Sequence, residues 1–375
     1  MRVEIVIYFY GIVCISMILF NVAYALLLKG SEPRMQRRQR KYRENAEIQL
    51  RRIYRGEKTD EIYLYDLYKK LRRIKNLIAF DRMLQELSSE NSGEEKSRTV
   101  RDYIIQLQPC ILQLAGFYRN KENTQAAYFS FFLSRHILPE HLSARNLQEV
   151  MLGYMEKDNL YCSVNVLKAL CTFGNEKDII LALKIQDQNS VFFHEKILTE
   201  TLLDYQGDHS RLITLIWENL RKFTPRTQLA LLNYIRFQSG DYTREMLSLL
   251  KENEADKEVI LAAIRYFGRY RYPPAFDLLL EFAEDDDPVR WEYVTVSVSS
   301  LAAYRDPRTI EVLKKALCSV NWYVRCAAAA SLEAQHVSDA DLTDIIDGDD
   351  RYAREIMQYQ LESGNLQREG DAKWK

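Results

Sequence analysis

The sequence has little glycine and little proline, the two residues that most often interrupt helices and form turns. Among 375 residues there are 13 glycines and 8 prolines. No long stretch alternates apolar and polar side chains, so the pattern of a half-buried β-strand is missing. Leucine and alanine are plentiful, and both favour helices. The composition therefore predicts an all-α protein. Its length exceeds what one compact core usually holds, which favours two domains or one elongated array.

The sequence also lacks the motifs of metal binding and catalysis. Its five histidines show neither H-x-x-x-H nor H-E-x-x-H spacing, and its six cysteines include no C-x-x-C pair. We therefore expect no metal site and no cofactor. Several cysteines occupy apolar helix positions, which indicates small buried side chains in a reducing compartment. No G-x-S-x-G, phosphate-binding loop or kinase motif is present. We expect a protein that is not an enzyme, while a Cys–His pair formed across the fold stays open.

Long apolar runs are missing except near the N-terminus. Residues 5–28 carry no charge over 24 positions. As a helix they would rise ~36 Å, enough to cross a ~30 Å hydrocarbon core, so we interpret them as a transmembrane anchor. The alternative is a cleaved signal peptide, because Ala23-Tyr24-Ala25 has the form of a cleavage site. Against it, the apolar run is longer than a signal core and continues to Leu28.

Charge is nearly balanced over the whole chain, with a net of −1, which disfavours a protein built to wrap nucleic acid. Residues 29–58 form a basic segment, in which ten bases accompany three acids between 29 and 55. The positive-inside rule then predicts a single-pass membrane protein with its N-terminus outside and its C-terminal part in the cytoplasm. Anionic lipid is the partner expected beside the basic segment.

Two short regions separate the basic segment from the rest of the chain. Residues 59–87 place apolar residues near helical spacing opposite a basic face. This pattern predicts an amphipathic helix, which either lies on anionic lipid or caps the domain that follows. Residues 88–97, SSENSGEEKS, contain no apolar residue and are interpreted as a linker.

From residue 98 to 365 helical stripes alternate with short turns, and the turns recur at a regular period. Gly174, Gly207 and Gly240 are spaced by 33 residues, and each separates two helical stretches. We expect each glycine to adopt the left-handed conformation that ends a helix. Regular spacing of this kind indicates a repeat architecture.

A second periodic feature lies in the C-terminal part. There an arginine follows a short polar residue by four positions, at the start of a helix. Each polar side chain can cap the helix and also accept a hydrogen bond from the arginine. The pairs are Asp286 with Arg290, Asn321 with Arg325, and Asp350 with Arg354.

The stretch DPRTIEVLKKALCSVNWYVRCAAAASL, residues 306–332, resembles the HEAT-like repeat first associated with phycobilisome lyases. The resemblance is most specific over 256–354. It implies an α-solenoid of HEAT-like helical hairpins over 98–365, preceded by the transmembrane helix. It also implies that Arg290 and Arg325 belong to a buried ladder with acidic neighbours. The small side chains of Ala327 to Ala330 would let adjacent helices approach closely.

The strongest surface signal is RYFGRYRYPPAFD, residues 265–277. Arginines alternate there with tyrosines, a pairing enriched at interface hot spots. The alternative is that the arginines complement the dipole at a helix C-terminus and are neutralised by the acidic run that follows. The candidate partner-binding residues are Arg265, Tyr266, Arg269, Tyr270, Arg271 and Tyr272.

Stacked hairpins form extended surfaces that bind peptides and protein domains. We therefore expect a membrane-anchored cytoplasmic scaffold or adaptor that binds a protein partner. Resemblance to anchored HEAT-repeat proteins of Gram-positive bacteria implies a membrane glycosyltransferase or a polysaccharide-export component as that partner. Two alternatives stay open: a HEAT-like enzyme, such as a bilin lyase or a DNA glycosylase, and a scaffold outside the cell.

Overall fold

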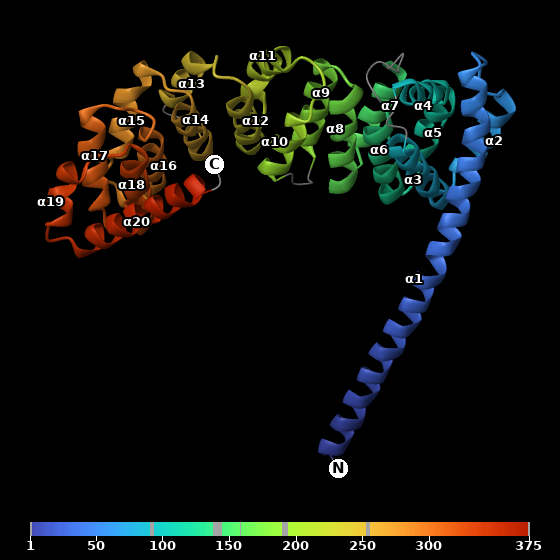
Figure 1. Ribbon diagram of the computed structural model, residues 1–375, viewed down its shortest axis with the longest axis horizontal. Coiled ribbons are helices and arrows are strands. Elements are labelled where there is room, and N and C mark those ends of the chain that lie inside the picture. The colour runs from blue at the N-terminus through green and yellow to red at the C-terminus, as the bar shows by residue number, and fades with distance from the viewer. Residues whose placement is uncertain are drawn as a thin grey trace. The chain divides into compact units, whose positions relative to one another are not determined.

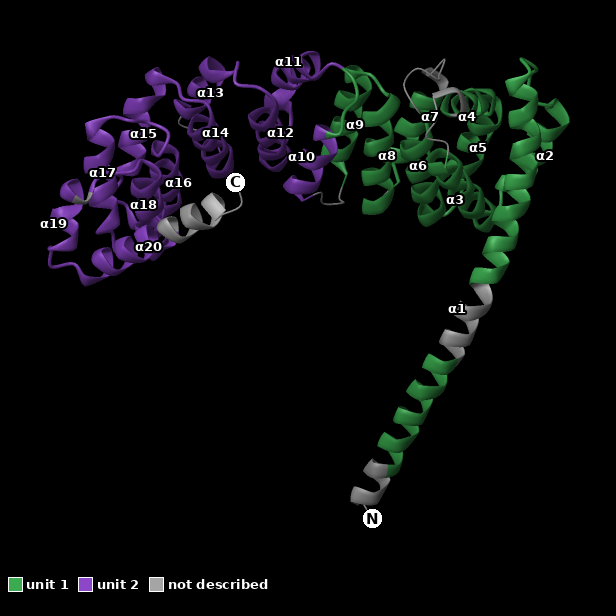
Figure 2. Cartoon of the chain, viewed as in Figure 1, with its two compact units in different colours: residues 1–192, 204–207 green, residues 193–203, 208–375 purple. Residues whose placement is uncertain are grey.

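The computed structural model describes residues 2–90, 94–137, 145–157, 159–189, 194–252 and 256–373, with the side chains of 2–7, 23–31, 94–96, 145–146, 339 and 364–373 left out. Every regular element in this part is a helix, and it contains no strand. The all-α prediction is confirmed. Clustering of contacts divides the chain into two compact units, residues 1–192 with 204–207 and residues 193–203 with 208–375 (Figure 2).

Unit 1 is a stack of helices in two rows (Figure 1). α3, α6 and α8 follow one another in one row, and α5, α7 and α9 follow one another in the other. α1 packs on α3 and α4, and α2 packs on α5. The elements are α1 (Arg2–Tyr54), α2 (Glu61–Leu71), α3 (Ile74–Glu90), α4 (Glu94–Gln106), α5 (Gln108–Arg119), α6 (Asn123–His136), α7 (Arg145–Met155), α8 (Leu160–Phe173) and α9 (Glu176–Gln188).

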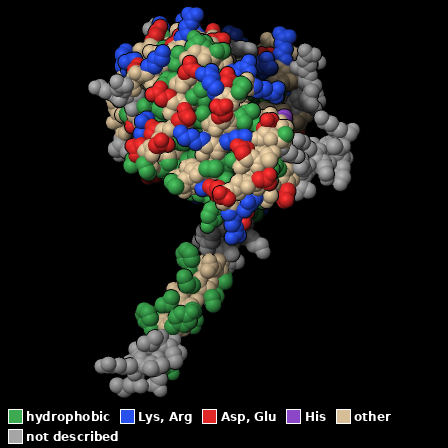
Figure 3. Space-filling model, turned by 90° about the vertical axis from the view of Figure 1, so that its left-hand side faces the viewer, with side chains coloured by type: hydrophobic (Ala, Val, Ile, Leu, Met, Phe, Trp, Pro, Cys, Tyr) green, Lys and Arg blue, Asp and Glu red, His purple; other side chains and the backbone are tan. Residues whose placement is uncertain are grey.

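The N-terminal helix corrects one prediction. α1 joins the predicted anchor (5–28) and the predicted basic segment into one helix. Its described apolar side chains between Tyr8 and Val22 are mostly exposed, and they form the green stretch of the thin stalk in Figure 3. Within the described residues no helix is long and apolar enough to cross a membrane. The predicted anchor and the single-pass localisation are therefore wrong.

Two further boundaries differ from the predictions. The region 59–87 forms two helices, α2 and α3, which are separated at Arg72 and Arg73. Their apolar residues, including Leu67 and Leu77, are buried in unit 1. α3 continues to Glu90 and α4 begins at Glu94, so the described residues of the predicted linker are helical. Glutamate is a good helix former, and its polarity alone does not end a helix.

Unit 2 continues the same architecture over its described residues. The even-numbered helices pack on one another in sequence, and we call them the even row. Each also packs on the odd-numbered helix before it, from α11 with α12 onward, which makes a series of hairpins. The elements are α10 (Glu195–Leu203), α11 (His209–Asn219), α12 (Pro225–Gln238), α13 (Thr243–Leu250), α14 (Lys257–Arg269), α15 (Phe276–Ala283), α16 (Trp291–Leu301), α17 (Pro307–Leu317), α18 (Trp322–Ala334), α19 (Thr343–Ile346) and α20 (Arg351–Lys373).

The periodic glycines occupy the turns, but for a different reason than expected. Among the described glycines only Gly56 has a positive φ, so the left-handed conformation predicted for Gly174, Gly207 and Gly240 is wrong. The turns need glycine for space. A Cβ on Gly174 would lie 2.6 Å from the carbonyl oxygen of Leu170, and one on Gly240 would lie 2.7 Å from the ring of Tyr270.

The alanine run belongs to α18, a helix of the even row. Ala328 and Ala329 are completely buried on α18, which packs on α16. One turn farther along α18, the buried hydroxyl of Ser331 donates to the carbonyl oxygen of Val298 at 3.0 Å. Small side chains thus allow the close helix contact that joins these two hairpins.

Candidate partner-binding site

The six residues proposed from the sequence separate into two groups, and the tyrosines form the first. Tyr266 is fully buried in α14. Its hydroxyl donates to the carbonyl oxygen of Ser239 at 3.0 Å and accepts from the backbone N–H of Tyr242 at 3.0 Å. The ring of Tyr270 lies 4.9 Å from that of Tyr266, and the ring of Tyr272 stacks on Phe267. The hydroxyl of Tyr266 therefore joins its hairpin to the one before it, while the rings of Tyr270 and Tyr272 pack on side chains of α14.

The arginines form the second group, at a pocket on the even row. Arg265 is half-buried and Arg269 is exposed, both on α14, and Arg236 approaches them from α12. Arg271 does not line this pocket. The pocket has a volume of about 590 Å³ and is lined by Arg236, Phe237, Arg265, Gly268, Arg269, Val296, Ser299 and Ser300.

The three arginines concentrate positive charge. Among the described residues, no carboxylate oxygen lies within 4.0 Å of the side-chain nitrogens of Arg236, Arg265 or Arg269. Burial lowers the pKa of Arg236, and the charges of Arg265 and Arg269 lower it further. The lining contains no acidic residue. The pocket is thus an unneutralised cationic site, in which each arginine raises the electrostatic energy of the others.

Aromatic and neutral groups complete the walls. Phe237 lies under two of the cations, with its ring centroid 4.9 Å from the guanidinium carbon of Arg236 and 5.4 Å from that of Arg269. On α16, the Ser299 hydroxyl donates to the carbonyl oxygen of Thr295, and that of Ser300 donates to a carbonyl oxygen of α14. The serine protons are therefore used within the fold, and the arginines are the hydrogen-bond donors that the lining leaves for a ligand.

The predicted ladder is found in part, between successive hairpins. Arg325 is largely buried and pairs with Asp350 at 2.9 Å, and it also donates to the carbonyl oxygen of Cys318. Asp350 in turn caps α20, accepting from the backbone N–H groups of Tyr352 and Ala353 at 3.0 Å. The hydrogen bond from Arg325, with those from the backbone, lowers the pKa of Asp350 to about 2.

Comparison with protein families identifies the repeat. The family model for HEAT repeats matches residues 243–333, which span α13 to α18. These residues are similar to HEAT repeats. The match includes the pocket residues of α14 and α16, while Arg236 and Phe237 lie on the helical hairpin just before it. No curated protein matches the chain. HEAT repeats indicate a protein-interaction scaffold.

The other ladder residues of the HEAT repeats differ from the predicted pairs. Arg290 pairs with Asp285 at 2.7 Å, and the cap at this turn is Asp287, so Asp286 takes neither role. Asn321 caps α18 as a short polar residue should. Arg354 donates to the carbonyl oxygen of Gly348 at 3.0 Å. An interval of four residues thus marked the turns correctly but did not identify the partner of each arginine.

Sequence reasoning missed Arg236, although a signal for it was present. Arg236 precedes Arg269 by 33 residues, the same interval that separates the three turn glycines. Two arginines at equivalent positions of adjacent repeats are expected to lie side by side in a solenoid. Phe237 precedes the candidate residue Tyr270 by the same 33 residues.

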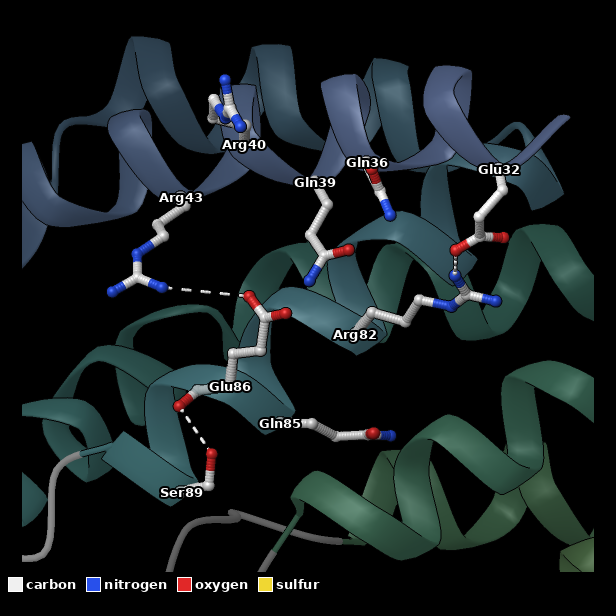
Figure 4. Close-up of a pocket in the computed structure, with 9 residues that line it drawn as sticks. All are labelled: Glu32, Gln36, Gln39, Arg40, Arg43, Arg82, Gln85, Glu86 and Ser89. Atoms are coloured by element: carbon white, nitrogen blue, oxygen red, sulfur yellow. Dashed lines mark hydrogen bonds and ion pairs between the residues drawn. The ribbon is translucent and has the colours of Figure 1, made fainter. Parts of the chain in front are cut away.

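In a second pocket, which lies in unit 1, two arginines are paired with carboxylates. It has a volume of about 840 Å³ and lies between α1 and α3. In Figure 4, Arg82 points toward Glu32, at 2.8 Å, and Arg43 points toward Glu86. Arg43 also pairs with Glu90 at 2.5 Å. Carboxylates already neutralise these two cations, so this pocket attracts an anion less than the pocket of unit 2. Among the described residues no group of three or more His, Cys, Asp or Glu side chains is placed to hold a metal ion.

Proposed function

We propose that this protein is a scaffold without catalytic activity, and that it binds an acidic segment of a partner protein on the even row of unit 2. The observation that supports this function is the pocket around Arg236, Arg265 and Arg269, whose lining contains no acidic residue. An acidic segment would supply the missing charge. HEAT repeats present extended helical surfaces of the kind that hold peptides.

The composition of the pocket supports a protein ligand. Arginine and large aromatic side chains dominate the binding energy of protein interfaces, and here Phe237 and the arginines are combined. Phe237 is 43% exposed, which leaves part of its ring available for contact with a partner. A purely electrostatic site would not need such an exposed apolar group.

Site-specific photo-crosslinking tests this function. A photoreactive phenylalanine analogue replaces Ser299, which is exposed and lines the pocket, in the protein expressed in its native cells. We expect a discrete crosslinked partner from this position. The same analogue at Glu311, exposed on α17 outside the pocket, is the control and should give no such product.

Charge reversal links the crosslink to the arginines. Arg265→Glu with Arg269→Glu should remove the crosslinked product, because the acidic segment would then be repelled. Arg271→Glu changes the charge in the same segment outside the pocket lining and should leave the product in place. Equal crosslinking from Ser299 and Glu311, or a product that survives the double reversal, would contradict the proposed function.

A further inference from the structure

Among the described residues, the three arginines of the pocket have no acidic partner, unlike several other arginines of unit 2. Several other arginines of unit 2 are paired: Arg290 with Asp285, Arg308 with Asp277, and Arg325 with Asp350. Those pairs show that acidic residues are available to this part of the chain. Three arginines that meet without one therefore call for an anion that the chain itself does not supply.

The walls hold the guanidinium groups in place for a compact ligand. The guanidinium carbons of Arg236 and Arg269 lie within cation–π distance of the Phe237 ring, which attracts both cations. A cation–π contact does not neutralise the charge of a guanidinium, whose N–H groups still need acceptors. The same ring therefore orients two of the three donors without neutralising them.

Close packing limits the space between the walls. A Cβ on Gly268 would come within 2.9 Å of the Ser300 hydroxyl oxygen and 3.0 Å of its Cα. The Ser300 hydroxyl is itself fixed by donating to the carbonyl oxygen of Ile264 at 3.1 Å. α14 and α16 thus meet closely at the pocket, which gives it a rigid neutral wall beside the arginines.

The number of charges selects among anions. A carboxylate brings one negative charge and two acceptor oxygens, which leaves most of the positive charge of three arginines uncompensated. A phosphomonoester brings about −1.5 to −2 charges and three terminal oxygens at neutral pH. Arginine binds such oxygens in pairs, and clusters of arginine are a common means of recognising phosphorylated side chains. The charge and the number of oxygens of a phosphomonoester therefore match this pocket better than those of a carboxylate.

We propose that the pocket around Arg236, Arg265 and Arg269 binds a phosphorylated side chain of the partner protein. This inference rests on the proposed function and adds the chemical group that is recognised. Binding would depend on the phosphorylation state of the partner, so the scaffold would hold the modified form.

Fluorescence anisotropy with the full-length protein tests the inference. Three labelled peptide libraries share random flanking residues and differ at one fixed position, which is phosphoserine, glutamate or serine. We expect the phosphoserine library to bind on the order of tenfold more tightly than the glutamate library. The serine library should bind most weakly.

Matched variants connect this binding to the pocket. Arg265→Gln with Arg269→Gln should reduce phosphoserine binding to the level of the serine library. Arg271→Gln should retain it, since Arg271 lies outside the pocket lining. In a second readout, inorganic phosphate should raise the melting temperature of the wild type more than that of the double variant, and circular dichroism should show that both are folded.

The outcomes distinguish a failure of this inference from a failure of the proposed function. Equal binding of the phosphoserine and glutamate libraries would overturn the phosphate inference and leave an acidic segment as the ligand. Binding of no library, together with loss of the Ser299 crosslink, would overturn both. A single-stranded oligonucleotide that displaces the phosphoserine library at equal concentration would overturn the assignment to a protein-borne phosphate.

Discussion

The smallest side chains of the chain determine how closely its helices pack. Ala328 and Ala329 are completely buried on α18, whereas Ala330 on the next position is exposed. Protein interiors are close-packed, so a buried methyl group in such a contact cannot be enlarged without moving a helix. The run of alanines therefore serves the stacking of the hairpins.

Ala329→Leu should destabilise unit 2 by about 1–3 kcal/mol, because three added carbon atoms overpack the fully buried surroundings of this residue on α18. Ala330→Leu is the matched control and should change the free energy of unfolding by less than about 0.5 kcal/mol. Urea unfolding of both variants measures the difference. Equal effects at the two positions would show that burial of the alanines is not what limits their size.

At the scale of the element, each hairpin is joined to the next by a few specific contacts, of which Arg325 with Asp350 is the most complete. The guanidinium of α18 meets a carboxylate that also caps α20, so one side chain both starts a helix and ties it to its neighbour. The hydrogen bond from Arg325 is the main cause of the low pKa of Asp350, about 2, against 3.8 in the unfolded chain.

Asp350→Asn should lower stability at neutral pH by ~1 kcal/mol or less, since it removes the ion pair but keeps a capping side chain. The folded pKa lies below the unfolded one, so the pair stabilises the wild type above about pH 4 and loses its effect as the pH falls toward 2. The difference between variant and wild type should shrink over that range. Parallel curves for Asp350→Asn and wild type would contradict the prediction.

The helices and turns were predicted best where a local capping signal agrees with the repeat period. The period of 33 and the capping residue Asn321 located helices and turns, because caps and hydrophobic stripes act within a few residues. The conformation of Gly174 was mispredicted because its turn is set by contact with a carbonyl oxygen, which local sequence does not reveal. The burial of Tyr266 could not be predicted for the same reason, because it depends on contacts with Ser239 and Tyr242 in the preceding hairpin.

At the scale of the whole molecule, the two units differ in how their unfolding can be observed. In a repeat protein each hairpin contacts only its neighbours, so stability is distributed along the chain rather than concentrated in one core. All four tryptophans of the sequence lie between residues 208 and 375, within unit 2. Tryptophan fluorescence therefore follows unit 2 alone, while far-ultraviolet circular dichroism follows the helices of both units.

Ala329→Leu gives the means to test whether the units unfold separately. If each unit is its own cooperative element, the substitution should move the whole fluorescence transition to lower urea but only part of the circular dichroism transition. The remaining part should coincide with that of the wild type, because Ala329 belongs to unit 2. A circular dichroism curve that shifts as a whole, together with the fluorescence curve, would instead mean that the 375 residues unfold as one cooperative array.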